Sequence, residues 1–438
     1  MAQNAVEAQN VSQGAATGLA DVKDPHPKES ITMSGLHHRR SRRLIGGIVG
    51  SALTLGALSL GSLSADATVS PRTVGITALP WSYQATTGGA TYTKTEAVAQ
   101  AKAFNIIAAN RNAYQNAVPA MRTANPDLKL LAYVNGAYAQ RSEGTKYPDS
   151  WYLRAKDGSK VRSRAYGNFL MRVGLSGWIQ DTANRCLSVI NHQNYDGCFI
   201  DMMGTASIRP VYVNSVPINP KTGKTFTDSE WLTLTSALSA KVQSLVGAGH
   251  PVYINGLGSG PRYFTGGAPS LDGIKGALAE SWLRGGEQSL SYYPGEHEWK
   301  QNIDMVGSMA ARGKVALMTV KTWGSGTDAQ LSAWRTYAIA SYLMAADGKA
   351  QFSFLARKTS DPTKVDPMLA GLQIGQPTAA YAKVGGVYQR PYSNGRVLVN
   401  PTGTTQTVQL GHSYKTTSGN WVTSVRLTPN DAEILTAS

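Results

Sequence analysis

The chain contains the almost unbroken apolar run Leu128-Lys129-Leu130-Leu131-Ala132-Tyr133-Val134. A strand with one face in water alternates apolar and polar residues, so an unbroken run is typical of a strand covered on both faces, as in a parallel sheet. Working outward from this run, β-branched or aliphatic runs occur at residues 74–79, 104–109, 129–134, 197–201, 251–255, 274–280, 314–320 and 351–355. Eight such strands favour closure into a barrel.

Amphipathic stretches separate these runs. Apolar residues recur at helical spacing over about residues 95–103, 177–191, 228–246, 296–312 and 327–346, and each stretch leads directly into a strand. Asp228 is a suitable N-cap for the third stretch. The alternation of strand and helix predicts the α/β class, with a (β/α)8 TIM barrel over residues 68–360.

The pattern changes after the eighth run. Residues 361–385 read as a linker or the last barrel segment, and alternating strands follow at 387–391, 396–400, 405–411 and 425–436. Turn signals such as Ser393-Asn394-Gly395 separate them. These features predict a small antiparallel β-domain over residues 386–438. We expect it to be a structural accessory to the barrel, and carbohydrate binding is the alternative.

The first 67 residues have the features of an export signal. Four arginines lie between residues 39 and 43, an apolar run covers 44–63, and Ala65-Asp66-Ala67 supplies a small-residue cleavage site. Residues 41–45 resemble a bacterial twin-arginine signal, and a start at Met33 would give a signal of normal length. An uncleaved anchor is the alternative. We expect a bacterial protein that is secreted or held at the cell wall, without stable membrane insertion after cleavage.

The charge is strongly positive, with 42 Lys and Arg against 27 Asp and Glu and a formal net charge of +15. Such a charge can concentrate a protein near acidic polymers. Here the basic residues are scattered and no nucleic-acid-binding motif accompanies them. We therefore expect a solvated basic surface and no nucleic-acid partner, with a dedicated anion site as the alternative.

Histidine and cysteine are scarce. The histidines outside the export segment are His192, His250, His297 and His412. None follows a predicted strand, so neither a histidine metal site nor a Ser-His-Asp triad is expected. No phosphate-binding glycine motif follows a strand, and we expect no cofactor. Cys186 and Cys198 either pair in a disulfide or stay as two buried thiols.

Two acids stand where barrel enzymes place their chemistry. Asp201 ends the strand Gly197-Cys198-Phe199-Ile200-Asp201, and Glu280 ends the run two strands later. The carboxyl ends of barrel strands carry the active site. Hydrolysis of a glycosidic bond needs two such groups, because one protonates the leaving oxygen while the other attacks or activates water. The alternative is structural, with each acid capping a helix or binding a loop arginine.

Other residues at the predicted strand ends or on long loops are amides, aromatics and one lysine. As candidate substrate-binding residues we select Trp81, Asn110, Asn135, Trp151, Asn255, Trp282, Lys321 and Trp323. Side chains of these types recognise sugar hydroxyls and stack on sugar rings. Each also has a structural interpretation, and Asn255-Gly256 is equally consistent with a turn.

The segments Trp151-Tyr152-Leu153-Arg154, Asn168-Phe169-Leu170 and Asp196-Gly197-Cys198-Phe199-Ile200-Asp201 resemble hypothetical glycosyl hydrolase family 15. This family is similar to the TIM-barrel glycosidases that include endo-α-1,4-polygalactosaminidase. The resemblance covers roughly residue 73 to the C-terminus. It implies that Asp201 is the nucleophile and Glu280 the acid/base. Other barrel glycosidases carry a nucleophilic Glu after the seventh strand, where this chain has Lys321-Thr322-Trp323.

The expected function is hydrolysis of an extracellular or cell-envelope polysaccharide. The reaction would retain the anomeric configuration if the two carboxyl groups lie about 5–5.5 Å apart, and would invert it if they lie about 6.5–9.5 Å apart. Two alternatives stay open at this point: a glycan-binding barrel without catalysis, and a carbohydrate lyase or transferase that uses the same acids.

Overall fold

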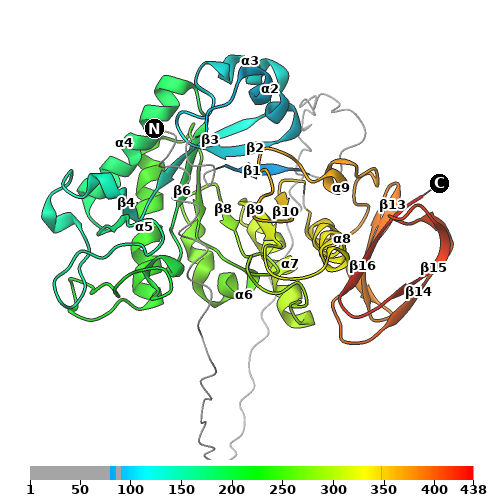
Figure 1. Cartoon of the computed structure of the whole chain (residues 1–438). Helices are drawn as coiled ribbons and strands as arrows, with labels where there is room; N and C mark the ends of the chain where they lie inside the picture. The colour runs from blue at the N-terminus through cyan, green and yellow to red at the C-terminus, as the bar shows by residue number, and fades with distance from the viewer. Residues whose placement is uncertain (1–78, 85–89, 347, 438) are drawn as a thin grey trace, which may run out of the picture. The chain divides into compact units, whose positions relative to one another are not determined.

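A computed structural model describes residues 79–84, 90–346 and 348–437, and all structural statements refer to them. Parallel strands form the predicted barrel (Figure 1). They are β1 (Trp81–Tyr83), β2 (Ile106–Ala109), β3 (Lys129–Asn135), β6 (Gly197–Asp201), β7 (Val252–Asn255), β8 (Gly276–Ala279), β9 (Val315–Lys321) and β10 (Gln351–Leu355). The barrel closes where Pro80 bridges Phe352 and where the Phe352 N–H donates to the Leu79 carbonyl at 3.0 Å.

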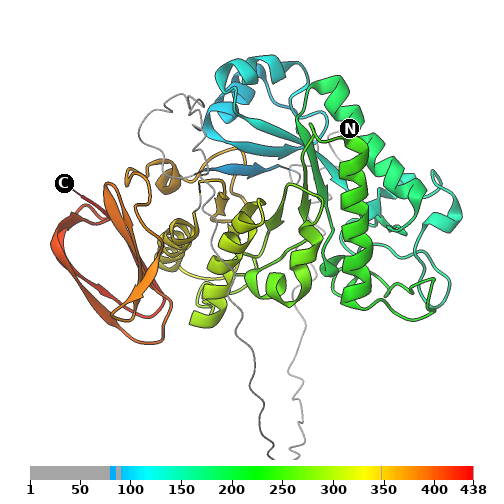
Figure 2. The same ribbon diagram turned by 180° about the vertical axis from the view of Figure 1, so that it is seen from behind.

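Helices surround the sheet, as the view from behind also shows (Figure 2). They are α2 (Lys94–Ala103), α3 (Val118–Ala124), α4 (Ser176–Gln193), α5 (Asp228–Val246), α6 (Gly260–Arg262), α7 (Glu296–Ala311), α8 (Asp328–Ala345) and α9 (Pro367–Ala370). Thr227 caps α5 with a reciprocal bond to Glu230, so the N-cap is one residue before the predicted Asp228. None of the helices in these ranges is long and apolar enough to cross a membrane.

The barrel interior is filled by alternate residues of the strands. This apolar cluster consists of Trp81, Tyr83, Ile106, Ala108, Leu131, Phe199, Tyr253, Leu278, Val315 and Leu317. Side chains two positions apart on a strand share a face, which explains the alternation. The second, larger cluster comes from the opposite faces of the strands and from the helices that cover them.

The first strand among the described residues lies after the range that the sequence predicted. Of the predicted range 74–79, residues 74–78 lie outside the described part of the chain, and β1 is Trp81–Tyr83. Trp81 and Tyr83 both point into the barrel, where their rings contact Phe199 at centroid distances of 6.2 and 5.3 Å. Two aromatic residues two positions apart indicate a strand as well as an aliphatic run does. The predicted segment 1–67 also lies outside the described residues.

The C-terminal residues form an antiparallel sheet, as predicted. Its strands are β11 (Ala382–Val384), β12 (Val387–Tyr392), β13 (Gly395–Asn400), β14 (Gln406–Lys415), β15 (Trp421–Leu427) and β16 (Asp431–Thr436), in the order β11-β12-β13-β16-β14-β15. The sheet starts inside the predicted linker. The single strand predicted at 425–436 is two strands, because the chain turns at Asn430, whose φ of 60° is left-handed.

Charged and aromatic contacts hold this sheet against the barrel helices. Arg390 donates to the carbonyls of Leu343, Met344 and Ala346 at 2.7–3.0 Å and so satisfies the end of α8. At the start of α7, Glu296 accepts from Lys383 and from the Tyr388 hydroxyl. These contacts fit the expected role of a structural accessory.

Cys186 and Cys198 are joined in a disulfide, with their Cα atoms 5.9 Å apart. The bond ties α4 to β6, the strand that ends in Asp201. Of the two alternatives that the sequence left open, the structure has the disulfide.

The barrel requires glycine where neighbouring strands start close together. A Cβ atom on Gly276 would overlap the carbonyl oxygen of Val315, whereas one on Gly307 in α7 would meet nothing within 4 Å. We predict that Gly276→Ala lowers the free energy of unfolding by about 2 kcal/mol, since the strands must move apart. Gly307→Ala, the matched control, should leave it unchanged or raise it by up to about 1 kcal/mol. Urea denaturation followed by fluorescence measures both, and equal stability of the two variants would contradict the prediction.

Candidate active site

Five polar side chains from consecutive strands form a connected cluster at the carboxyl end of the barrel. They are Tyr133 on β3, Asp201 on β6, Asn255 on β7, Glu280 directly after β8 and Lys321 on β9. The Tyr133 hydroxyl donates to Asp201 Oδ2 at 2.8 Å, and Lys321 Nζ forms an ion pair with Glu280 Oε1. The predicted pair of acids is therefore brought together within one hydrogen-bonded network.

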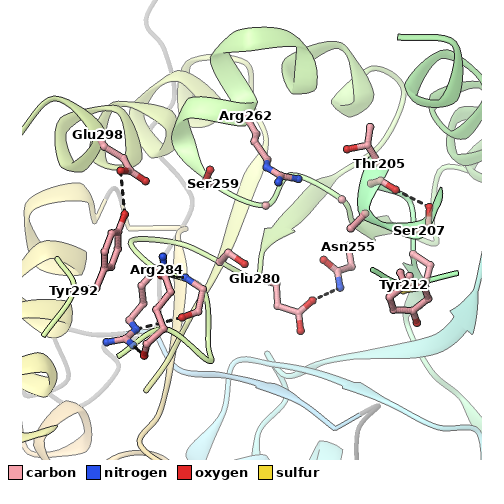
Figure 3. A pocket seen from close by; sticks show the side chains of 18 residues that line it. Thr205, Ser207, Tyr212, Asn255, Ser259, Arg262, Glu280, Arg284, Tyr292 and Glu298 are labelled. Carbon is pink, nitrogen blue, oxygen red and sulfur yellow. Dashed lines mark hydrogen bonds between the residues drawn. The ribbon is translucent and has the colours of Figure 1, made fainter. Parts of the chain in front are cut away.

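Asn255 connects the two acids through a single atom. Its Nδ2 donates to Asp201 Oδ1 at 2.9 Å and to Glu280 Oε2 at 2.7 Å. The second of these bonds is drawn in Figure 3. Because both bonds start at one nitrogen, one oxygen of Asp201 and one oxygen of Glu280 are held close to the same point in the barrel mouth.

Strand alternation explains why these residues meet. Each of them lies two positions after a residue of the apolar barrel interior, or four positions in the case of Lys321. The pairs are Leu131 and Tyr133, Phe199 and Asp201, Tyr253 and Asn255, Leu278 and Glu280, and Leu317 and Lys321. Since residues of equal parity share a face, the polar side chains continue the interior upward into the barrel mouth.

Asp201 is the more deeply buried acid, with 7% of its surface exposed. Burial and the nearby charge of Glu280 raise the pKa of Asp201 above its usual value, although three hydrogen bonds act in the opposite direction. These bonds come from Tyr133, from Asn255 and from the Met202 N–H, which donates to Oδ1 at 2.8 Å. All three donors are neutral, so Asp201 has no cation of its own.

Glu280 has a different environment. Burial by itself would raise the pKa of Glu280, but the charge of Lys321 and the hydrogen bonds from Lys321 and Asn255 outweigh it and lower the pKa. Lys321 is 8% exposed, and its ammonium lies 4.6 Å from the centre of the Trp323 ring. Two neighbouring acids with opposite pKa shifts are the arrangement that separates acid and base roles.

Three tyrosines surround the pair. Burial and the charges of Asp201 and Glu280 raise the pKa of Tyr83 well above its ordinary value. Burial and the charge of Asp201 do the same for Tyr133 and Tyr212. All three therefore stay protonated near neutral pH and can act as hydrogen-bond donors beside the acids.

Two cavities open near the acids. A cavity of about 460 Å³ is lined by Glu280, Asn255, Tyr212, Arg262 and Tyr292, as Figure 3 shows. A larger cavity of about 1100 Å³ is lined by Tyr133, Asn135 and Asn110. Asn255 of the smaller cavity and Tyr133 of the larger one both donate to Asp201, so one side chain separates this acid from each cavity.

Several predicted substrate-binding residues lie at these cavities. Asn110 and Asn135 line the larger one, and Asn255, Lys321 and Trp323 lie at or beside the acids. The Oδ1 atom of Asn135 accepts from the backbone N–H groups of the turn that follows it, so this oxygen shapes the loop.

Three predicted tryptophans line neither cavity. Trp81 and Trp282 are fully buried, and their indole N–H groups donate to the carbonyls of Met318 and Asn302. No ring face is left for a sugar, because both rings fill the core. Trp151 packs against Tyr147 at the start of α4, away from both cavities.

Some residues of the site were not selected from the sequence. Tyr133, Tyr83 and Arg284 lie at the acids or in the smaller cavity. Tyr133 had a usable signal, because it lies two residues before Asn135 on one strand and must share its face. Nothing in the sequence placed Arg284 here, since its position depends on the loop after β8. Within the described ranges, no group of three His, Cys, Asp or Glu residues could hold a metal ion.

Comparison with solved structures finds α-amylases from bacteria and a fungus. The Anoxybacillus α-amylase is 12% identical with a TM-score of 0.44, and the match covers 79% of this chain and 89% of the amylase. The Geobacillus thermoleovorans α-amylase complexed with acarbose is 13% identical with a TM-score of 0.44, covering 82% and 96%. The Malbranchea cinnamomea α-amylase is 9% identical with a TM-score of 0.45, covering 82% and 96%.

The sequence comparison is more specific. None of the curated proteins matches the chain. The family model described as hypothetical glycosyl hydrolase family 15 matches residues 113–396, which is more than half of the chain and includes both acids. The chain therefore belongs to hypothetical glycosyl hydrolase family 15 and is a glycoside hydrolase.

Proposed function

We propose that the protein cleaves an extracellular or cell-envelope polysaccharide with retention of configuration, using Asp201 and Glu280. The observation that carries this proposal is the shared donor: one nitrogen of Asn255 binds both carboxylates and sets their separation. Two carboxyl groups held together by one donor favour a direct attack on the sugar, as in retaining glycosidases, over attack by a water molecule between acid and substrate. The location outside the cell rests on the signal-like features of residues 1–67.

The position of each acid supports a division of roles. Asp201 is buried at the end of β6, where three neutral donors orient its carboxylate. Glu280 lines the smaller cavity, from which a leaving group and then water can reach it. We therefore assign Asp201 as the nucleophile and Glu280 as the acid/base, which agrees with the roles that the family resemblance implies.

The reaction then proceeds in two steps. Glu280 gives its proton to the glycosidic oxygen while an oxygen of Asp201 bonds to the anomeric carbon, so the leaving chain departs as an alcohol and a glycosyl ester remains. Glu280, now ionised, takes a proton from water, and the resulting hydroxide attacks the same carbon and releases Asp201. Tyr133 and Asn255 donate to Asp201 in the free protein, and they hold the carboxylate in line for attack.

The proton has to be on Glu280 when the first step begins. In the free protein, the charge and the hydrogen bond of Lys321 lower the pKa of Glu280 and so oppose this protonation. A sugar oxygen that displaces Lys321 from Glu280 removes the main cause of the lowered pKa. Binding of the substrate thus favours protonation of Glu280.

Removal of either acid should abolish cleavage. We predict that Asp201→Asn and Glu280→Gln each reduce kcat by about 10³-fold or more on whichever cell-wall or biofilm glycan the wild type degrades. Asp127→Asn, an exposed loop change, is the matched control and should keep full activity. Oligosaccharide release measures all three proteins. Full activity of either acid variant would refute the site, and glycan binding by the wild type without any release would indicate a non-catalytic barrel.

The stereochemistry of the product tests the short spacing of the acids. We predict that the first product seen by ¹H NMR has the anomeric configuration of the substrate, because two displacements occur at one carbon. Azide should rescue an Asp201→Ala variant with formation of the inverted glycosyl azide, and should rescue Glu280→Ala with formation of the retained one. A first product of opposite configuration would contradict the retaining mechanism, and exchanged azide products would exchange the two roles.

The ion pair of Lys321 predicts a pH effect. Burial raises the pKa of Glu280, but the charge of Lys321 and the hydrogen bonds from Lys321 and Asn255 lower it overall. Lys321→Met removes the cation that stabilises ionised Glu280, so the pKa of Glu280 rises and the limb of the kcat/KM profile that Glu280 controls moves to higher pH. Lys321→Arg keeps the charge and should leave the profile near its original position. An unchanged profile in Lys321→Met would show that Lys321 does not control Glu280.

A further inference from the structure

The charged residues that line the larger cavity are all basic. Its charged lining residues are Arg111, directly beyond the end of β2, and Arg141, at the start of the short helix Arg141–Glu143. No acid lines this cavity among the described residues, and the remaining lining is amide, hydroxyl and aromatic. The smaller cavity differs, because two acids, Glu280 and Glu298, line it together with two arginines, Arg262 and Arg284.

Neither arginine is engaged by a carboxylate. The guanidinium of Arg111 has only a long contact of 3.5 Å with the Asn112 side chain, and the aliphatic part of Arg141 covers Gly167. Two arginines on neighbouring helices do have carboxylate partners: Arg122 binds Asp196 at 2.7 Å where β6 begins, and Arg185 binds Asp181 at 2.9 Å within α4. Among the residues that the structure describes, no acid neutralises the two that face the cavity.

Arg284 shows what a structural arginine looks like in this protein. It is 2% exposed, donates to the carbonyls of Gln288 and Ser289, and lies 4.6 Å from the centre of the Trp334 ring. The Nη2 atom of its guanidinium is thus used by the loop that it holds, whereas its buried Nη1 atom has no hydrogen-bond partner among the described residues. Arg111 and Arg141 are exposed and have no comparable contacts, so their donors are available to a ligand.

We propose that the larger cavity binds a glycan unit that carries an anionic group, so that the substrate is an acidic polysaccharide. Guanidinium groups bind carboxylate and phosphate oxygens with paired, charge-assisted hydrogen bonds. Asn110, Asn168 and Tyr166 supply the amide and aromatic groups that recognise the rest of a sugar ring. The net charge of +15 also favours the approach of a polyanion. The inference rests on the proposed function for the place of the cavity beside the acids.

Binding without turnover tests the inference. Calorimetry at low salt would compare three probes: tetragalacturonate, its fully methyl-esterified form, and an oligomer of glycerol phosphate. We expect the wild type to bind at least one of the two anions about tenfold or more tightly than the neutral ester, and to lose this preference at high salt. The anion that binds more tightly identifies a carboxylate or a phosphate as the recognised group.

The variants locate the site. The double variant Arg111→Gln/Arg141→Gln should lose about tenfold or more in affinity for the anion and nothing for the ester. Arg396→Gln/Arg426→Gln removes the same charge from the C-terminal sheet and is the matched control. Thermal unfolding of both variants checks that they are folded.

The possible results separate clearly. Equal affinity for acid and ester, no binding of either anion, or equal losses in the two double variants would each overturn the inference. Because no cleavage is measured, the result is independent of the hydrolysis tests on Asp201 and Glu280. An active hydrolase that binds acid and ester equally well would keep the proposed function and lose the acidic substrate.

Discussion

A closed barrel forces every second side chain of its strands into one enclosed space, and this constraint organises the whole site. The lower part of the space is filled by aromatic rings, with Trp81 and Tyr83 packed around Phe199. The next inward positions hold the polar cluster, which therefore rests on an apolar floor. Burial on that floor is the main cause of the raised pKa of Asp201. The packing of the core and the chemistry of the acids are thus consequences of one alternation.

The two acids differ because the strands beside them carry different donors. Asp201 receives neutral donors from β3, β7 and the backbone, whereas Glu280 receives the cation Lys321 from β9 as well as Asn255. Asn255 donates one hydrogen bond to each acid and lowers the pKa of both, so it holds the acids together without separating their pKa values. The cation that lowers the pKa of Glu280 is Lys321, which stands at the position where other barrel glycosidases carry an acid.

Much of this arrangement could be predicted from the sequence, because a parallel barrel obeys simple periodic rules. Seven strands and both acids were located by apolar runs that end in polar residues. The rules failed where the apolar signal was aromatic, as at Trp81, which was taken for a rim residue and is part of β1. Burial of Trp282 could not be foreseen either, because it depends on a bond to Asn302 in α7, far along the chain. Tyr133 was within reach of the alternation rule but was counted only as core.

The cavities differ from the acid pair, because loops build most of their walls. The chain between β3 and α4 carries Arg141 to the Asp201 side, and the chain after β8 folds Arg284 into its own carbonyl groups on the Glu280 side. The strands alone would produce the same pair of acids with any loops. The proposed charge selection among glycans therefore depends on the loops, which decide whether an arginine faces a cavity without an acid beside it. Among the described residues, Arg111 and Arg141 are in that position.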